Sequence, residues 1–512
     1  MTKGDKRQGK VYLVGAGPGD PGLITLKALE CLNRADVVLY DFLAETALLA
    51  HAPDQAELIY VGKKGSDHTM AQSEINRLIV DKAASGKVVV RLKGGDPFIF
   101  GRGGEEVEEL AAEGLPFEIV PGVTSAIAVP AYAGIPLTHR GFTSSVAFIT
   151  GHEDPTKTES SIRWDKIATG IGTLVFLMGV RNLPRITGSL IEAGRDPATP
   201  AALIRRGTSP DQATLTGTLD SLAAQAQKAG FRPPAVLIVG DVVGLRDKMS
   251  WFETKPLFGR RIMVTRTRTQ ASVLTRALMD LGAGVVECPT IRLTQPENWN
   301  LVDQAVDKIA GFDWLVLTSP NGVDYFFERL WSRGLDARVL APVKLAAIGP
   351  ATAGRLERFG LRADLVPKEY VAEGLIQALK ELDLKGKNVL LARASEARDV
   401  LPRELTAAGA RVFEAALYQT LPPDGLPPKA RQALESGDID LVSFTSSSTV
   451  TNLVHLLGDR LAWFKSNIPA ACIGPITART AGEAGFDVAV EAKEYTIDGL
   501  VQAVSEYFAA SG

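Results

Sequence analysis

The stretch from Val88 to Glu105 contains the residues with the clearest potential for chemistry. It begins as a β-branched run, which predicts a buried strand. Five glycines then follow among basic and acidic residues, starting with Gly94 and Gly95. A strand that ends in so many glycines lets the backbone approach a ligand closely. Because ligands of open α/β sheets bind at the carboxyl ends of the strands, this stretch predicts a small-molecule site.

A second glycine cluster, Gly15-Ala16-Gly17-Pro18-Gly19-Asp20, follows a predicted strand and precedes a helix near Leu23. It invites comparison with the dinucleotide-binding fingerprint. The glycines fall at positions one, three and five, whereas that fingerprint needs one, three and six. Pro18 also removes a backbone donor from the loop. Asp41, however, ends the second strand where a ribose-binding acid would lie, so a nicotinamide-dependent oxidoreductase stays open as an alternative.

Composition limits the class of protein. A chain of 512 residues is expected to form about two to four domains. A net charge of -3 gives no general attraction to nucleic acid or membranes, and no apolar run approaches the ~20 residues that span a bilayer. Met1 to Lys10 is polar and no apolar segment follows it, so we expect no signal peptide and a cytoplasmic protein.

Cysteine and histidine positions argue against metal or disulfide chemistry. Cys31, Cys288 and Cys472 lie far apart in apolar contexts and are expected to be buried, reduced thiols. The histidines, at 51, 68, 139 and 152 in the N-terminal half, do not form a set with metal-ligand spacing. We therefore expect no metal site.

The N-terminal half repeats a strand–loop–helix rhythm, which predicts parallel α/β units. The expected strands are 11–14, 37–40, 88–90, 117–120, 146–150, 173–177, 201–204 and 235–239. Pro121-Gly122-Val123-Thr124 is expected to separate two lobes, of about residues 11–121 and 124–242. The segment 243–257 is charged and lacks a strong apolar period, so we place a linker there. Residues 1–10 are a polar tail, and a second domain covers 258–512.

The C-terminal half contains an internal repeat. Phe312 to Val323 matches Ile439 to Val450, and Ala346 to Ala353 matches Ala471 to Ala478. Arg261 to Arg266 likewise resembles Lys387 to Arg393. Two copies of one α/β unit predict two similar lobes, and a cleft between such lobes often binds a ligand.

The motifs of the N-terminal half resemble those of the uroporphyrinogen-III C-methyltransferase family over about residues 11–241. They are Gly15 to Asp20 with Leu23 to Ala28, Leu39-Tyr40-Asp41, Val61-Gly62-Lys63, Arg91 to Glu105, and Gly134 to Arg140. The resemblance implies a two-lobed tetrapyrrole methylase-type α/β domain, typically a homodimer. That family uses S-adenosyl-L-methionine, with S-adenosyl-L-homocysteine as product, to methylate uroporphyrinogen III twice and form precorrin-2.

The resemblance also implies a set of cofactor-binding residues. They are Pro18, Gly94, Gly95, Asp96, Ile99, Thr124, Ser125, Met178 and Gly207. Gly94 and Gly95 would let the backbone approach adenosine, and Asp96 could serve the sulfonium or the amino acid portion. Met178 offers a soft apolar wall, although it could equally be a core residue.

Three further residues match the catalytic set of that family. Asp41 matches the candidate base and Lys63 the candidate proton donor. Arg91 would meet substrate carboxylates, which suit a guanidinium fork. The alternatives are a turn residue for Asp41 and a solvated surface for Lys63 and Arg91. Positioning of donor and acceptor is expected to supply much of the rate.

The C-terminal half resembles uroporphyrinogen-III synthase. The matching motifs are Thr318 to Val323, Ile348 to Ala353, Leu417 to Thr420, Phe444-Thr445-Ser446 and Ile473 to Ala478. The resemblance implies two flavodoxin-like lobes joined by a two-stranded ladder, one of about 258–292 with 421–512 and the other of about 293–420. That family takes hydroxymethylbilane, expels its hydroxyl, inverts ring D and closes the macrocycle without a cofactor.

Tyr418 matches the tyrosine that assists departure of the hydroxyl as a proton donor. The resemblance has acetate and propionate groups bound by Ser319, Thr352, Ser446 and Thr477. These four could instead be helix caps and turn residues. Ser447 departs from the family, since it replaces a proline often found in that loop.

Together the two resemblances predict a multifunctional, cytoplasmic tetrapyrrole enzyme that converts hydroxymethylbilane into precorrin-2 for sirohaem or cobalamin biosynthesis. The product of the C-terminal reaction is the substrate of the N-terminal one. We expect small-molecule tetrapyrrole substrates, no nucleic acid or membrane partner, and a homodimer formed through the methyltransferase domain. Besides the oxidoreductase, a methyltransferase fused to a non-catalytic, bilobal ligand-binding domain stays open.

Overall fold

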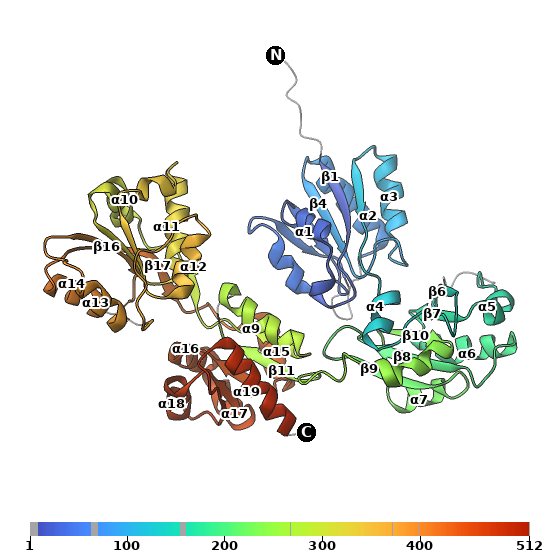
Figure 1. The fold of residues 1–512 in the computed structure, drawn as a ribbon. Helices are drawn as coiled ribbons and strands as arrows, with labels where there is room; N and C mark the ends of the chain where they lie inside the picture. The colour runs from blue at the N-terminus through green and yellow to red at the C-terminus, as the bar shows by residue number, and fades with distance from the viewer. Residues whose placement is uncertain are drawn as a thin grey trace, which may run out of the picture. The chain divides into compact units, whose positions relative to one another are not determined.

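The computed structural model describes residues 9–62, 70–153, 160–266, 268–370, 372–397 and 399–510 (Figure 1). These residues form four five-stranded sheets. The chain divides into two compact units. One holds the chain up to Ile262, Arg276–Val285 and the residues from Val504, and the other holds Met263–Thr275 and Val286–Ala503. The expected α/β class is confirmed.

The first lobe is a parallel sheet with the strand order β3-β2-β4-β1-β5. Its elements are β1 (Lys10–Gly15), α1 (Leu26–Leu32), β2 (Val37–Tyr40), β3 (Glu57–Tyr60), α2 (Gln72–Ala84), β4 (Val88–Lys93), α3 (Gly103–Ala112) and β5 (Phe117–Val120). Tyr12 and Val14 pack toward α1, while Val11 and Leu13 pack toward α2 and α3. Because both faces are covered, the central strands β1 and β2 are almost entirely apolar.

The second lobe has the strand order β6-β7-β10-β8-β9. Its elements are α4 (Ser125–Tyr132), β6 (Val146–Thr150), α5 (Trp164–Gly170), β7 (Thr173–Leu177), α6 (Leu183–Glu192), β8 (Pro200–Arg205), β9 (Ala213–Thr218), α7 (Leu222–Lys228), β10 (Ala235–Val239) and α8 (Arg246–Met249). α4 packs against β7 and β10. Pro121 to Thr124 lies between β5 of the first sheet and α4 of the second lobe.

The expectation of parallel units is wrong for part of this second sheet. β6 and β7 are parallel, but β10 runs antiparallel to both β7 and β8, and β8 runs antiparallel to β9. The loop between β8 and β9 is too short for the crossover that parallel neighbours need. β9 was not predicted, because its alternating, half-buried sequence Ala213-Thr-Leu-Thr-Gly-Thr218 is polar for a strand.

The expected linker, 243–257, is packed rather than extended. Its first residues lie in a 3-10 turn, Asp241–Leu245, and in α8. Trp251 Nε1 donates to the carbonyl of Ala131 in α4 at 2.9 Å, and Phe252 is buried against Tyr132. This segment therefore continues the packing of the second lobe. The functional boundary between the domains stays a prediction.

The third sheet has the order β12-β11-β18-β19-β20, which is the flavodoxin order 2-1-3-4-5. Its lobe contains β11 (Arg261–Val264), α9 (Arg268–Asp280), β12 (Gly284–Glu287), α15 (Pro428–Ser436), β18 (Leu441–Phe444), α16 (Ser447–Leu457), α17 (Leu461–Asn467), β19 (Ala470–Cys472), α18 (Pro475–Glu483), β20 (Val488–Glu491) and α19 (Ile497–Ala510).

The fourth sheet has the order β13-β17-β16-β14-β15. Its lobe contains β13 (Arg292–Thr294), α10 (Asn300–Asp307), β14 (Trp314–Leu317), α11 (Pro320–Ser332), β15 (Lys344–Ala347), α12 (Pro350–Glu357), α13 (Ala372–Lys380), β16 (Asn388–Ala394), α14 (Val400–Ala407) and β17 (Arg411–Leu421). The chain enters through β13 and leaves through β17, which pair antiparallel with Leu293 opposite Thr420. This pair is the expected two-stranded ladder.

The repeat inferred from the sequence corresponds to equivalent elements in these two lobes. β14, α11, β15 and α12 follow the same order as β18, α16, β19 and α18. The three cysteines are buried and unpaired, as expected. None of the helices in the described ranges has the length and apolar character that crossing a bilayer requires.

Candidate active sites

The two glycine clusters of the first lobe meet at one edge of its sheet. β1 lies between β4 and β5, so the loops that follow these strands are neighbours. The amide of Gly17 donates to the carbonyl of Gly95 at 3.2 Å, and the amide of Gly95 donates to the carbonyl of Gly17 at 2.7 Å. Both glycines have positive φ, +80° and +70°. A side chain is disfavoured at this crossing, because both backbones adopt a conformation suited to glycine.

Asp96 ties two of these loops together. Its Oδ1 accepts the amides of Phe98 and Ile99 at 2.8 and 3.1 Å, and its Oδ2 accepts the amide of Gly122 at 3.0 Å. Both carboxylate oxygens are thus bonded to backbone within the protein. A contact of Asp96 with the sulfonium or amino acid portion of a cofactor stays a prediction.

The second lobe contributes the loop after β8 and the start of α4. Thr124 caps α4, accepting the amide of Ala126 at 3.3 Å, and Ser125 is the first residue of that helix. A Cβ atom at Gly207 would lie 2.4 Å from Val129 of α4, so only glycine fits there. The next residue, Thr208, accepts the amide of Asp20 in the first glycine loop at 3.2 Å. The two lobes therefore meet where the predicted cofactor residues gather.

Strained backbone concentrates in the same loops. Five non-glycine residues of the described ranges have positive φ, namely Phe100, Arg102, Met178, Arg206 and Thr208. They follow β4, β7 and β8, at the carboxyl ends of these strands. Such conformations cost on the order of 1–3 kcal/mol each and cluster at functional sites. Ile99 and Met178 are also 38% and 50% exposed here, while Pro18 is half-buried. Exposed apolar side chains beside open loops fit a nucleoside.

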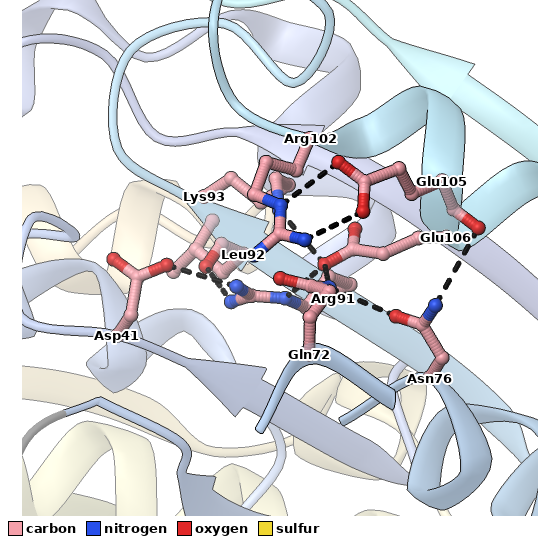
Figure 2. A network of polar contacts seen from close by, with 9 residues as sticks. All are labelled: Asp41, Gln72, Asn76, Arg91, Leu92, Lys93, Arg102, Glu105 and Glu106. Atoms are coloured by element: carbon pink, nitrogen blue, oxygen red, sulfur yellow. Dashed lines mark hydrogen bonds and ion pairs between the residues drawn. The ribbon is translucent and has the colours of Figure 1, made fainter. Parts of the chain in front are cut away.

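Asp41, directly after β2, and Arg91, inside β4 rather than at its end as expected, are brought together as an ion pair. Arg91 Nη2 donates to Asp41 Oδ2 at 2.9 Å, and Asp41 Oδ1 accepts the amide of Leu43 at 3.1 Å (Figure 2). The Asp41 side chain is 25% exposed, whereas that of Arg91 is 4% exposed. Asp41 is therefore a fixed carboxylate that ligands can still reach. Lys63 lies outside the described residues.

The guanidinium of Arg91 is committed to protein acceptors. Besides Asp41, it donates from Nη1 to the carbonyl of Leu92 at 3.1 Å and from Nε to Glu106 at 3.2 Å. This arrangement favours a role in holding Asp41. The expected contact of Arg91 with substrate carboxylates stays a prediction.

Sequence reasoning missed Glu106 and Lys93. Lys93 Nζ donates to Glu106 Oε1 at 2.8 Å, and both side chains are buried. A signal for Glu106 was available, since Gly103, Glu106 and Leu110 form the buried face of α3. A glutamate on that face needs a buried partner.

In the C-terminal half, Tyr418 and Ser319 are in contact. Their hydroxyl oxygens lie 3.0 Å apart, although the residues are far apart in sequence. Ser319 caps α11 and accepts the amide of Gly322 at 2.9 Å, and the Tyr418 ring stacks on Tyr325 at 5.4 Å. Burial raises the pKa of Tyr418, while the Ser319 hydrogen bond opposes that shift. The phenol therefore stays protonated at neutral pH, as a proton donor must.

The other three predicted substrate residues occupy equivalent helix starts in the two lobes. Thr352 in α12 and Thr477 in α18 are 1% and 5% exposed. Ser446 precedes α16, and its hydroxyl lies 2.9 Å from that of Ser448. Ser447, at the family's proline position, is the first residue of α16 and its hydroxyl lies 2.7 Å from that of Thr480. Binding of acetate and propionate groups by these residues stays a prediction.

The repeat also places one exposed tyrosine in each lobe, which the sequence reasoning missed. Tyr370 and Tyr495 are 61% and 66% exposed. A Cβ atom added at Gly349 would lie 3.2 Å from Tyr370, and one added at Gly474 would lie 2.9 Å from Tyr495. The signal was the repeated Lys-Glu-Tyr with a glycine four residues later, at 368–374 and 493–499.

Comparison with known proteins assigns each half of the chain to a protein family. Residues 10–223 match the family model of tetrapyrrole (corrin/porphyrin) methylases, and residues 272–502 match that of uroporphyrinogen-III synthase HemD. The porphyrin biosynthesis protein HemD of Ruminiclostridium josui is 40% identical over 499 residues, covering 97% of this chain and 98% of that protein. An S-adenosyl-L-methionine-dependent uroporphyrinogen III methyltransferase of Methanosarcina barkeri is 57% identical over 47% of this chain and 94% of its own length. A solved uroporphyrin-III C-methyltransferase from Thermus thermophilus, complexed with S-adenyl homocysteine, is 44% identical, with a TM-score of 0.40, over 46% of this chain and 99% of that one.

The four sheets and these matches define a class of two-part enzymes, a tetrapyrrole methylase followed by a uroporphyrinogen-III synthase. The chain belongs to the family of porphyrin biosynthesis proteins that includes HemD of Ruminiclostridium josui, which aligns with 97% of it. Both expected families are thereby confirmed. The activities of the two halves are those of a uroporphyrinogen-III C-methyltransferase and a uroporphyrinogen-III synthase, in place of a nicotinamide-dependent oxidoreductase.

Proposed function

We propose that this protein converts hydroxymethylbilane into precorrin-2 in two stages. Its C-terminal half closes the bilane with inversion of ring D, and its N-terminal half methylates the resulting uroporphyrinogen III twice. The observation that supports this most is the Ruminiclostridium josui relative, a porphyrin biosynthesis protein that aligns with 97% of this chain, across both family matches. The product would serve sirohaem or cobalamin biosynthesis.

For methyl transfer, S-adenosyl-L-methionine supplies the methyl group when bound. The loops after β1, β4, β5, β7 and β8 would hold it, with the exposed Ile99 and Met178 against its nucleoside. Addition of the methyl group to a fully substituted pyrrole carbon leaves the macrocycle with one proton in excess, and Asp41 accepts that proton from elsewhere on the macrocycle. Arg91 keeps that carboxylate in one orientation through its 2.9 Å contact. A fixed base near the reacting carbon contributes typically about 10²–10⁴-fold.

For ring closure, Tyr418 donates its phenol proton to the departing hydroxyl of the bilane. Ser319 orients the phenol, since it accepts the amide of Gly322 and can donate its own proton to the Tyr418 oxygen. In that arrangement the Tyr418 proton is left for the substrate. The carboxylates of the substrate are bound by the helix starts at Thr352, Ser446 and Thr477.

The cellular location and the oligomeric state of the protein are part of the same proposal. We place the protein in the cytoplasm, as a homodimer formed through the methyltransferase domain. The uroporphyrinogen III that the C-terminal half makes is the substrate that the N-terminal half methylates.

Incubation with hydroxymethylbilane tests the proposal directly. Without S-adenosyl-L-methionine, uroporphyrinogen III should accumulate, and with it the products should gain one and then two methyl groups by mass spectrometry. Formation of only the type I isomer by a protein that still binds the bilane would favour a non-catalytic, ligand-binding C-terminal half. Type III isomer without methylation would refute the methyltransferase assignment alone.

A further inference from the structure

We propose that Glu106 is a positioning residue for methyl transfer, which fixes Arg91 so that its guanidinium holds Asp41. The inference rests on the roles proposed above for Arg91 and Asp41. It adds a residue that does not itself reach the ligand edge, since the Glu106 side chain is fully buried at 0% exposure. Figure 2 shows Glu106 and Asp41 on opposite sides of Arg91.

One oxygen of Glu106 collects three donors. Its Oε1 accepts Arg91 Nε at 3.2 Å, Lys93 Nζ at 2.8 Å and Gln72 Nε2 at 3.2 Å. Gln72 is itself held by Asn76 at 2.8 Å, so α2 supports the same atom from a second element. Glu106 Oε2 is buried without a hydrogen-bond partner. The carboxylate is therefore oriented so that Oε1 accepts hydrogen bonds from Arg91 and Lys93, while Oε2 is left without a donor.

The sheet explains why this carboxylate is needed. Arg91 and Lys93 are two residues apart on β4, so their side chains point to the same face, and both residues are nearly buried at 3% and 4% exposure. Burial lowers the pKa of Lys93, and the charge of Arg91 adds to the shift. Two buried cations on one face repel each other unless an anion lies between them. Glu106, projecting from α3, is that anion.

The geometry goes beyond charge balance. A carboxylate that only neutralised Lys93 would not need to touch Arg91. Here Glu106 binds Nε and the carbonyl of Leu92 binds Nη1, which leaves Nη2 directed at Asp41. Two protein acceptors other than Asp41 thus fix the plane of the guanidinium group. Loss of Glu106 would leave Arg91 free to rotate away from Asp41.

The test separates positioning from folding in the full-length protein, supplied with uroporphyrinogen III. Glu106→Gln is compared with Glu108→Gln, the same change at an exposed site of α3. Because Glu106→Gln leaves a buried cation unbalanced, a second variant, Lys93→Met with Glu106→Leu, removes both partners. Replacing a buried ion pair by apolar residues of similar volume often preserves stability. Thermal melting reports whether the methyltransferase half of each protein is folded, and bilane cyclisation by the same preparation controls for the amount of intact protein.

We expect Lys93→Met with Glu106→Leu to melt close to wild type and to cyclise bilane normally, while kcat for methylation falls about tenfold. The KM for S-adenosyl-L-methionine should not change, since the cofactor loops are untouched. Lys93→Met alone should retain more activity than this double variant. A double variant with wild-type kcat would overturn the proposal and leave Glu106 a structural counter-ion.

Coupling with Arg91 completes the test. If Glu106 acts through Arg91, adding Glu106→Leu to a protein that carries Arg91→Ala and Lys93→Met should lower kcat by less than about twofold. Losses that multiply would overturn the positioning role while leaving the role of Arg91 intact. Normal methylation by Arg91→Ala alone would refute the role of Arg91, and with it this inference.

Discussion

Tyr132 in α4 donates its phenol hydrogen to Asp20 Oδ2 at 2.6 Å, which joins the second lobe to the first glycine loop. The same Asp20 donates its amide to Thr208 at 3.2 Å, and the amide of Thr208 donates to Gln212 Oε1 at 2.9 Å. Gln212 in turn donates to Glu253 of the junction segment at 2.7 Å. A continuous set of hydrogen bonds thus connects residue 253 with the predicted cofactor loop.

Tyr132→Phe should loosen this loop. Burial and the hydrogen bond to Asp20 raise the pKa of Tyr132, so the phenol stays protonated throughout the working pH range. Removing a hydrogen bond to a charged group costs about 1.5–3 kcal/mol. We expect a lower melting temperature and a higher KM for S-adenosyl-L-methionine, with bilane cyclisation unchanged. An unchanged KM and melting temperature would show that the Tyr132 contact contributes nothing to the loop.

The domain boundary can be tested with fragments. We predict that the two halves fold separately and retain their activities, but that the methyltransferase fragment must include the packed residues after 250. A fragment ending at residue 258 should methylate uroporphyrinogen III, whereas one ending at 250 should be less stable. Burying Phe252 alone is worth about 1.5–3 kcal/mol, and Trp251 and Glu253 add hydrogen bonds. Equal melting temperatures for the two fragments would show that residues 243–257 act only as a linker.

Asp41→Asn and Arg91→Ala should each lower methyl transfer at least tenfold, measured with uroporphyrinogen III as substrate. Losing one partner of a buried, charged hydrogen bond costs about 2–5 kcal/mol, which is enough for that effect. Bilane cyclisation in the same samples is the control, because these residues lie outside the synthase half. Near-normal methylation in both variants would leave the pair a structural feature of the strand ends.

Tyr418→Phe should slow formation of uroporphyrinogen III by about 10²-fold or more, since general acid assistance is worth that much. The type I isomer should then increase through spontaneous closure. Ser319→Ala should show a smaller decrease of the same kind, because it removes the partner 3.0 Å from the phenol oxygen. Methylation of supplied uroporphyrinogen III should be normal in both. An unchanged isomer ratio in Tyr418→Phe would limit this residue to packing.

The three thiols should resist modification in the folded protein. Burial raises the pKa of Cys288 and of Cys472 from 9.0 to about 12, and it also raises that of Cys31. Since unfolded thiols ionise near pH 9 and folded ones do not, stability falls as pH rises from about 9 toward 12. A thiol reagent at pH 8 should label the protein only after denaturation. Rapid labelling of the native protein would contradict the burial of these groups.

The amino-acid sequence by itself determined the fold class, both enzyme families and most strands. The strands at 37–40, 173–177 and 235–239 have the predicted limits, because a continuous apolar run indicates burial on both faces without reference to any partner. The repeat in the C-terminal half was likewise readable, since equivalent strands carry equivalent loops.

Only the tertiary structure decided which polar groups meet. The direction of β10 depends on its neighbours β7 and β8, and nothing in its own residues specifies it. Arg91 contacts both Asp41 and Glu106, which the sequence alone did not reveal. Along the chain, Arg91 is 50 residues from Asp41 and 15 residues from Glu106. A sequence pattern indicates that a charged side chain lies on a buried face, but packing of α3 on β4 determines which opposite charge it finds there.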